Sequence, residues 1–150
     1  MNKQSKHTVL AAALGLTLVV SGAALANGDD DAKECSNASL RGLYLFSASG
    51  FNIVGGTPQP KSVVEYIRFN GDGTLTVPAA TVSINGVITR SPPGGTGTYT
   101  VLSDCTGTLQ FGPPGPAFDL FTSSKGGDVV MIQTGPGAPV MQGTADRLSR

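Results

Sequence analysis

Glu65 is the residue of this chain best placed to do chemistry. It lies in an apolar segment in which Val63, Glu65, Ile67 and Phe69 occupy alternate positions. Because side chains of a β-strand point alternately to two faces, Glu65 is expected on the same face as Ile67 and Phe69. A carboxyl group buried on such a face has a raised pKa and can act as an acid, a base or a ligand contact. The alternative is a position at the rim of the fold, where Glu65 contacts water or pairs with an arginine.

Three tyrosines, Tyr44, Tyr66 and Tyr99, are the other polar candidates for contacting a ligand. Each lies in the middle of a segment with strand-like alternation. Tyrosine is common at such positions as an ordinary packing residue. Each hydroxyl is therefore a candidate ligand contact, and packing within the sheet is the alternative for all three.

Histidine, which Ser-His and Cys-His catalytic pairs and many metal sites require, is missing from the predicted mature chain. His7 is the one histidine, and it lies in a predicted signal peptide. The mature chain would therefore hold no Ser-His or Cys-His pair for nucleophilic catalysis and no histidine to bind a metal. We predict no catalytic residue, no metal site and no cofactor.

Cys35 and Cys105 are the two cysteines of the chain. In an exported protein two cysteines are expected to form a disulfide, because the compartment is oxidising. A reactive thiol or a metal thiolate is the alternative, but neither cysteine has a histidine or lysine beside it in the sequence.

The first 26 residues have the pattern of a secretory signal peptide. Lys3 and Lys6 precede an apolar run over residues 8–20, and Ala24, Leu25 and Ala26 form a small-x-small cleavage site. The run is shorter than the roughly 20 residues of a membrane span. We predict cleavage after Ala26 and a periplasmic or extracellular protein without a membrane span. Residues 27–34 would be a disordered acidic leader, and residues 35–150 a single β-barrel domain.

Charge narrows the set of partners. Without Lys3 and Lys6 the mature chain has eight basic residues against ten acidic ones. Its arginines are scattered along the sequence, and nucleic acids and anionic membranes require clustered positive charge. Both are therefore poor candidates, which leaves a small hydrophobic ligand or a protein partner.

Alternating apolar residues and turn signals predict eight β-strands. Two Asn-Gly pairs, at residues 70–71 and 85–86, mark tight hairpin turns. We predict a loop over residues 52–60 and an interruption of the third strand near Pro78. The predicted strands cover residues 40–51, 61–70, 74–84, 87–102 (interrupted at 91–95), 106–111, 117–123, 129–134 and 140–148.

Short consecutive strands without crossover helices must cover their edges. An all-β, eight-stranded antiparallel up-and-down barrel does so, and a two-sheet β-sandwich is the alternative. The barrel is favoured because nearly every connection has the length of a hairpin. Such an interior is either filled by side chains or just able to hold one small ligand.

Several motifs resemble a group of small exported bacterial proteins that has no assigned function. They include SNASLRGLYLFSASG after Cys35, EYIRFNGDGTLT, GTGTYTVLSDCTGTLQF and a closing GTADR. The resemblance implies a barrel similar in shape to the calycin and allene-oxide-cyclase barrels. The chain departs from true lipocalins, because Tyr44 stands where their Gly-x-Trp motif has tryptophan.

Together these features predict a non-catalytic binding or interaction module. Its candidate ligand is a small hydrophobic molecule. A cyclase- or isomerase-like barrel enzyme that shapes a reactive apolar substrate is the alternative. A cavity of roughly 300 Å³ or more would support either function. An interior filled by Phe46, Ile67, Phe69 and Phe118 would exclude both and leave a structural or surface-interaction role.

Overall fold

The computed structural model of the protein describes residues 34–135 and 140–150. In these residues the chain forms one short 3₁₀ helix, η1 (Asn37–Ser39), and nine β-strands. The strands are β1 (Arg41–Val54), β2 (Thr57–Asn70), β3 (Thr74–Ile84), β4 (Val87–Ser91), β5 (Gly95–Val101), β6 (Thr106–Phe111), β7 (Ala117–Thr122), β8 (Asp128–Gln133) and β9 (Val140–Ser149). The predicted signal peptide and residues 27–33 of the predicted leader lie outside the described residues. No helix in the described part of the chain is long and apolar enough to span a bilayer.

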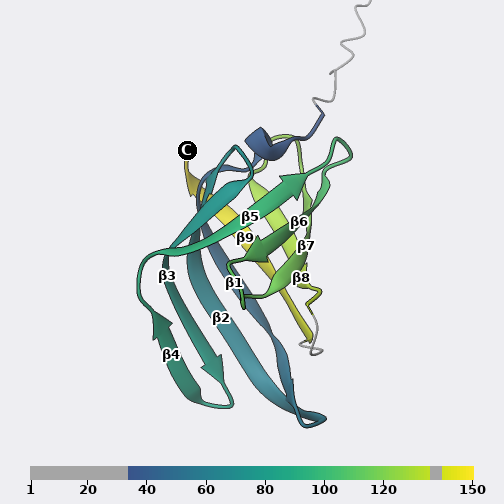
Figure 1. The fold of residues 1–150 in the computed structure, drawn as a ribbon. Helices are drawn as coiled ribbons and strands as arrows, with labels where there is room; N and C mark the ends of the chain where they lie inside the picture. Colours follow the sequence, from purple (N-terminus) through teal and green to yellow (C-terminus); the bar gives the residue numbers. More distant parts are fainter. Residues whose placement is uncertain (1–33, 136–139) are drawn as a thin grey trace, which may run out of the picture. The chain divides into compact units, whose positions relative to one another are not determined.

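Eight of the strands close a barrel (Figure 1). Antiparallel pairing runs through β1, β2, β3, β5, β6, β7, β8 and β9, and β9 pairs with β1 to complete the ring. The prediction of an eight-stranded antiparallel barrel is therefore confirmed. The two-sheet sandwich is wrong, because the β1–β9 and β2–β3 pairings leave no break between two sheets.

Glycines allow the close approach of β1 and β9 where the barrel closes. A Cβ atom on Gly50 would lie 1.8 Å from the carbonyl oxygen of Val140, and one on Gly143 would lie 2.3 Å from that of Ser47. Any side chain at either position would collide with the neighbouring backbone. Both glycines are thus required by the contact between these strands.

β4 is an additional strand outside the barrel. The sequence prediction joined it to β5 as one interrupted strand, which is wrong. Within residues 34–135 and 140–150, β4 pairs only with the second half of β3 (Ala80 to Ile84), whereas β5 pairs with the first half (Thr74 to Val77). The predicted interruption near Pro78 does not divide the strand: β3 is continuous, and Val77 and Pro78 form a bulge in it opposite Ile67. The exchange of partners occurs at this bulge. Because proline has no N–H to donate, it fits this position.

The predicted loop over residues 52–60 is also wrong. β1 continues to Val54, Gly55 and Gly56 form a tight turn with positive φ, and β2 begins at Thr57. Pro60 is accommodated because its carbonyl oxygen accepts a hydrogen bond from Asn85 N, on the side away from β1. The nitrogen of a strand residue faces the same side as its oxygen, so β1 loses no hydrogen bond.

The end of the β1–β2 hairpin and the β3–β4 hairpin form a projection, residues 52–61 and 80–91. We call this projection the sheet extension. In Figure 1 it is the lower part of β1, β2 and β3 together with β4, and it reaches beyond the ends of β5 to β8. Its β4 edge is exposed along its whole length.

The middle of the barrel is filled by side chains. Phe46, Ile67, Phe69 and Phe118 are all buried, with at most 2% of each exposed. Aromatic rings contact one another edge to face in two groups: Tyr44, Phe69 and Tyr99 toward η1, and Phe46, Phe118 and Phe111 toward the other end. The barrel therefore has no room for a ligand in its centre, which is the outcome expected above for a structural or surface-interaction role. A ligand site would have to lie outside the centre, toward one end.

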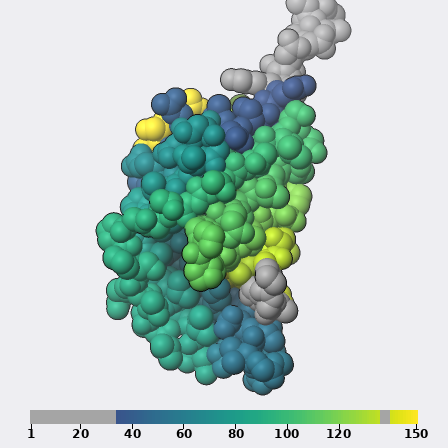
Figure 2. Space-filling model, in the orientation of Figure 1, coloured from purple at the N-terminus to yellow at the C-terminus, as the bar shows by residue number. Residues whose placement is uncertain are grey.

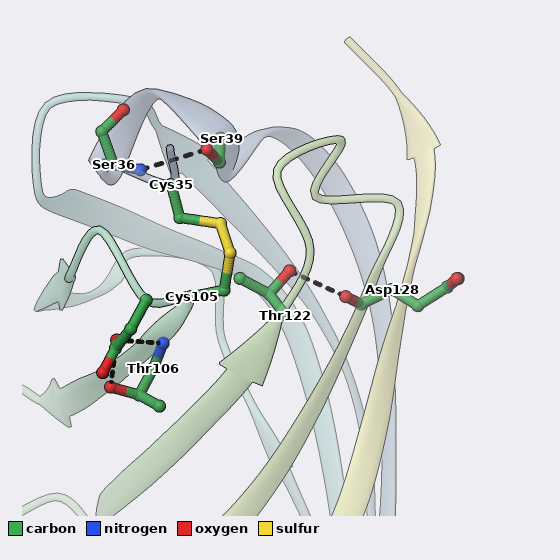
Figure 3. Close-up of a disulfide and its surroundings, with 8 residues drawn as sticks. Cys35, Ser36, Ser39, Cys105, Thr106, Thr122 and Asp128 are labelled. Atoms are coloured by element: carbon green, nitrogen blue, oxygen red, sulfur yellow. Dashed lines mark hydrogen bonds between the residues drawn. A yellow bond between two sulfur atoms is a disulfide. The ribbon is translucent and has the colours of Figure 1, made fainter. Parts of the chain in front are cut away.

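A disulfide holds the segment containing η1 against the barrel (Figure 3). Cys35 and Cys105 are bonded, with their Cα atoms 5.0 Å apart, so the predicted bridge is confirmed. Cys35 N also donates to the carbonyl oxygen of Ser103 at 3.2 Å. Cys105 has a positive φ of 69°, in a turn where Asp104 accepts hydrogen bonds from the backbone and hydroxyl of Thr106.

Candidate functional site

Glu65 faces the interior of the fold at the end of the barrel opposite η1. Its cross-strand neighbours are Phe46 on β1 and Ala80 on β3. Ile67, two residues further along β2, is fully buried, as the shared face requires. Glu65 itself is half-buried.

A cavity of about 220 Å³ lies over Glu65. The sheet extension forms one wall, through Lys61, Val82 and Ile84, and Phe111 and Pro116 lie on the barrel side. The remaining lining residues are Phe46, Val63, Glu65, Ala80, Ser91, Phe118 and Met141. Figure 2 shows a recess in this region, between the bright-green loop after β6 and the teal and blue strands.

Larger hollows exist on the outer wall of the barrel, but they are poorer sites. One of about 570 Å³ is a shallow groove lined by small residues such as Ser49 and Ser62, and one of about 500 Å³ lies over Thr74 and Thr96. Neither has a charged side chain in its lining. The smaller cavity is chemically the better site because it combines enclosure with an ionisable group.

Burial controls the ionisation of Glu65. Desolvation raises the pKa of its carboxyl group from 4.5 to about 7, and the positive charge of Lys61 opposes the shift only partly. Burial likewise lowers the pKa of Lys61, and Glu65 opposes that change. No hydrogen bond from the described part of the chain contributes to the Glu65 shift. The cavity therefore contains a carboxyl group whose charge changes near neutral pH.

The three tyrosines do not line this cavity. Tyr66 is 40% exposed on the outer face of β2. Tyr44 is buried near η1, where its hydroxyl donates to the carbonyl oxygen of Gly126 and accepts from Arg147 Nε at 2.9 Å. Burial raises the pKa of Tyr44, and the hydrogen bond from Arg147 opposes that shift.

Tyr99 connects three segments at the same end of the barrel. Its hydroxyl lies 2.9 Å from the carbonyl oxygens of both Asn37 and Leu40, to which it donates, and it accepts from Gly71 N at 3.0 Å. The hydroxyl therefore fastens the η1 segment and the β2–β3 turn to β5. This is a role in the fold.

We expect Tyr99→Phe to lower the free energy of unfolding by about 2 kcal/mol, because it leaves buried backbone groups without their partner. The ring and its edge-to-face contact with Phe69 would be retained. Urea unfolding followed by circular dichroism measures the loss. Tyr66→Phe makes the same change on the exposed face and should have an effect close to zero; equal losses in the two variants would contradict this assignment.

Sequence reasoning missed part of the cavity. The alternation that places Glu65 inward also places Lys61 inward, so this residue could have been found from the same pattern. Phe111 and Pro116 could not, because they come from β6 and the loop after it, about fifty residues further along the chain. Only the closed barrel brings that loop over the sheet extension.

The expectation that basic residues are scattered is wrong at the opposite end of the barrel. Arg41, Lys125, Arg147 and Arg150 all line one pocket of about 280 Å³. β1 begins and β9 ends at this pocket, whereas Phe46 and Met141 on the same strands line the Glu65 cavity. The two sites therefore lie at opposite ends of the barrel.

No family model, no curated protein and no solved structure matches this chain.

Proposed function

We propose that the protein is an exported, non-catalytic binding module that holds a small, mostly apolar ligand in the Glu65 cavity. The observation that carries the proposal is the ionisable carboxyl group of Glu65 within an otherwise largely apolar lining. Export is supported by the signal-peptide pattern of residues 1–26 and by the disulfide, which suits an oxidising compartment. The closed eight-stranded meander supports the likeness to small exported barrels of calycin-like shape.

The dimensions of the cavity define the class of ligand. Its volume of about 220 Å³ is below the roughly 300–1,000 Å³ of typical ligand pockets, so the ligand is a small molecule or one end of a larger one. The aromatic and aliphatic walls favour an apolar body. Glu65 favours a cationic or hydrogen-bond-donating group at one end, because the carboxylate form can only accept hydrogen bonds.

A matched series of probes tests this proposal: 2-phenylethylamine, 2-phenylethanol and ethylbenzene, titrated by calorimetry. At pH 8, where Glu65 is ionised, we expect the amine to bind about tenfold more tightly than the alcohol, through a charge-assisted hydrogen bond. Amine affinity should fall as the pH drops through about 7. Glu65→Gln should abolish the preference for the amine.

Two further variants make the result specific to the cavity. Ala80→Leu adds a side chain at a lining position beside Glu65 and should block all three probes. Glu34→Gln makes the conservative substitution at an exposed site and should leave binding unchanged. The proposal is overturned if no probe binds the unmodified protein, or if Glu65→Gln binds the amine as tightly as the unmodified protein does.

A cyclase- or isomerase-like enzyme is the second candidate. A carboxyl group with a pKa of about 7 is suited to general acid–base catalysis at neutral pH, and Lys61 is a second titratable group in the same cavity. Chromatography of any ligand recovered after incubation with the protein distinguishes the two. A binding module returns the ligand unchanged, whereas an isomerase returns a different isomer.

A further inference from the structure

A second pocket, at the η1 end of the barrel, combines positive charge with hydroxyl groups. The four basic residues that line it are Arg41, Lys125, Arg147 and Arg150. Ser36, Ser39 and Ser124 also line it. We call this site the basic pocket. No aspartate or glutamate of the described chain is among its lining residues.

Four separate elements contribute to the basic pocket. Arg41 begins β1, Arg147 lies near the end of β9 and Arg150 directly follows that strand. Lys125 lies in the β7–β8 turn, Ser36 precedes η1, and Ser39 is its last residue. The disulfide and the β1–β9 pairing fix these elements in place. The pocket is therefore a product of the closed fold and not of a flexible basic tail.

Arg147 is held rigidly at the base of this arrangement. Its Nε donates to the hydroxyl of Tyr44 at 2.9 Å, and Nη2 donates to the carbonyl oxygen of Ser39 at 2.6 Å. Its guanidinium carbon lies 5.3 Å from the centre of the Tyr44 ring. These contacts use two of the five N–H donors of the guanidinium group, which leaves others to face a ligand.

Glycine backbones position the arginines around the pocket. A Cβ atom on Gly126 would lie 2.0 Å from Ser39 O and 2.8 Å from Arg147 Nη2, so the β7–β8 turn packs directly on the anchored guanidinium. The side chain of Arg41 lies against Gly71 at the β2–β3 turn. Like charges repel one another when the fold gathers them, and a bound anion would remove that repulsion.

We propose that the basic pocket binds a phosphate group, either free or carried by a larger molecule such as a lipid. Guanidinium groups bind phosphate oxygens through paired N–H donors, lysine adds a point charge, and serine hydroxyls donate to the remaining oxygens. A tetrahedral oxyanion accepts hydrogen bonds from several directions at once. This geometry suits the basic pocket, whose hydrogen-bond donors come from four different elements. This ligand is distinct from the apolar one expected at the opposite end.

The test is a calorimetric titration with inorganic phosphate at low ionic strength, where charge screening is weak. The variant Arg41→Gln/Lys125→Gln/Arg150→Gln leaves the anchored Arg147 in place. We expect it to weaken phosphate binding by about tenfold or more. Arg68→Gln/Arg90→Gln removes positive charge from residues that line neither the basic pocket nor the Glu65 cavity and should retain the affinity of the unmodified protein.

A parallel arm distinguishes the source of the phosphate. It measures co-sedimentation of the protein with phosphatidylglycerol vesicles. Binding to the vesicles that is lost in the triple variant and kept in the control identifies a lipid headgroup as the source. This result holds even where free phosphate binds too weakly to titrate. Both arms are repeated in an Asp29→Asn/Asp30→Asn/Asp31→Asn background, which removes acidic residues near Ser36 in the sequence that could compete. The proposal is overturned if neither phosphate nor vesicles bind in either background, or if the triple variant and the Arg68→Gln/Arg90→Gln control bind equally.

Discussion

Cys35→Ser/Cys105→Ser is expected to lower the free energy of unfolding by about 4 kcal/mol, the largest single effect we predict. The bridge closes a separation of 70 residues, and a cross-link over that length strongly restricts the unfolded chain. It also attaches the η1 segment, whose Leu40 is fully buried at the end of the barrel. Small domains have total stabilities of about 5–15 kcal/mol, so the variant should be marginally folded.

Urea unfolding of the oxidised protein, the reduced protein and the double serine variant measures this effect. The reduced protein and the variant should agree, because both lack the bond while keeping a small side chain at each position. A reduced protein as stable as the oxidised one would show that the hydrogen bonds of Tyr99 and Cys35 N hold the η1 segment without the bridge.

Glu65→Gln is expected to stabilise the protein increasingly as the pH rises, by up to about 3 kcal/mol above pH 7. The pKa of Glu65 is raised from 4.5 to about 7 in the folded protein. Below pH 4.5 the carboxyl group is neutral in both the folded and the unfolded state. Between pH 4.5 and 7 the unfolded chain loses the proton and the folded protein keeps it, so the free energy of unfolding falls with rising pH.

Glutamine has no proton to release, so the variant lacks this loss. The measurement is the difference in the free energy of unfolding between variant and unmodified protein at pH 4, 5, 6, 7 and 8. Glu34→Gln controls for the substitution itself at an exposed position. A difference that stays constant from pH 4 to pH 8 would mean that water reaches the Glu65 carboxyl freely and that burial does not affect its ionisation.

The barrel could be predicted from the sequence because its signals are local. Alternation at successive positions defined β6 (Thr106–Phe111) to the residue, and both ends of β3 (Thr74–Ile84) were predicted correctly although an interruption was expected near Pro78. Asn85 and Gly86 adopt the positive φ values that an Asn-Gly hairpin turn requires. Glu65 lines the inside because its neighbours two residues away are apolar, and that information also lies within one strand.

The errors arose where a residue's role depends on distant parts of the chain. Pro58 and Pro60 suggested a loop. A β-strand nevertheless tolerates proline at positions where the missing N–H would face away from the neighbouring strand. β4 could not be separated from β5 by pattern, since only the pairing with β3 distinguishes them. The basic pocket was missed for the same reason: Arg41 and Arg147 are far apart in sequence and meet only when the barrel closes.

Closure between β1 and β9 has a consequence for how the protein folds. The side chains of Tyr44 and Arg147, which are 103 positions apart in the sequence, are joined by a hydrogen bond. Contacts this distant form late, because long-range closure costs chain entropy before it gains contacts. A chain that emerges in order can build each successive hairpin from its own neighbours, but the free edge of β1 stays open until Ser149 has arrived. During that interval the first strand is open to pairing with other chains, so the slow step of folding and the risk of aggregation coincide at the same edge.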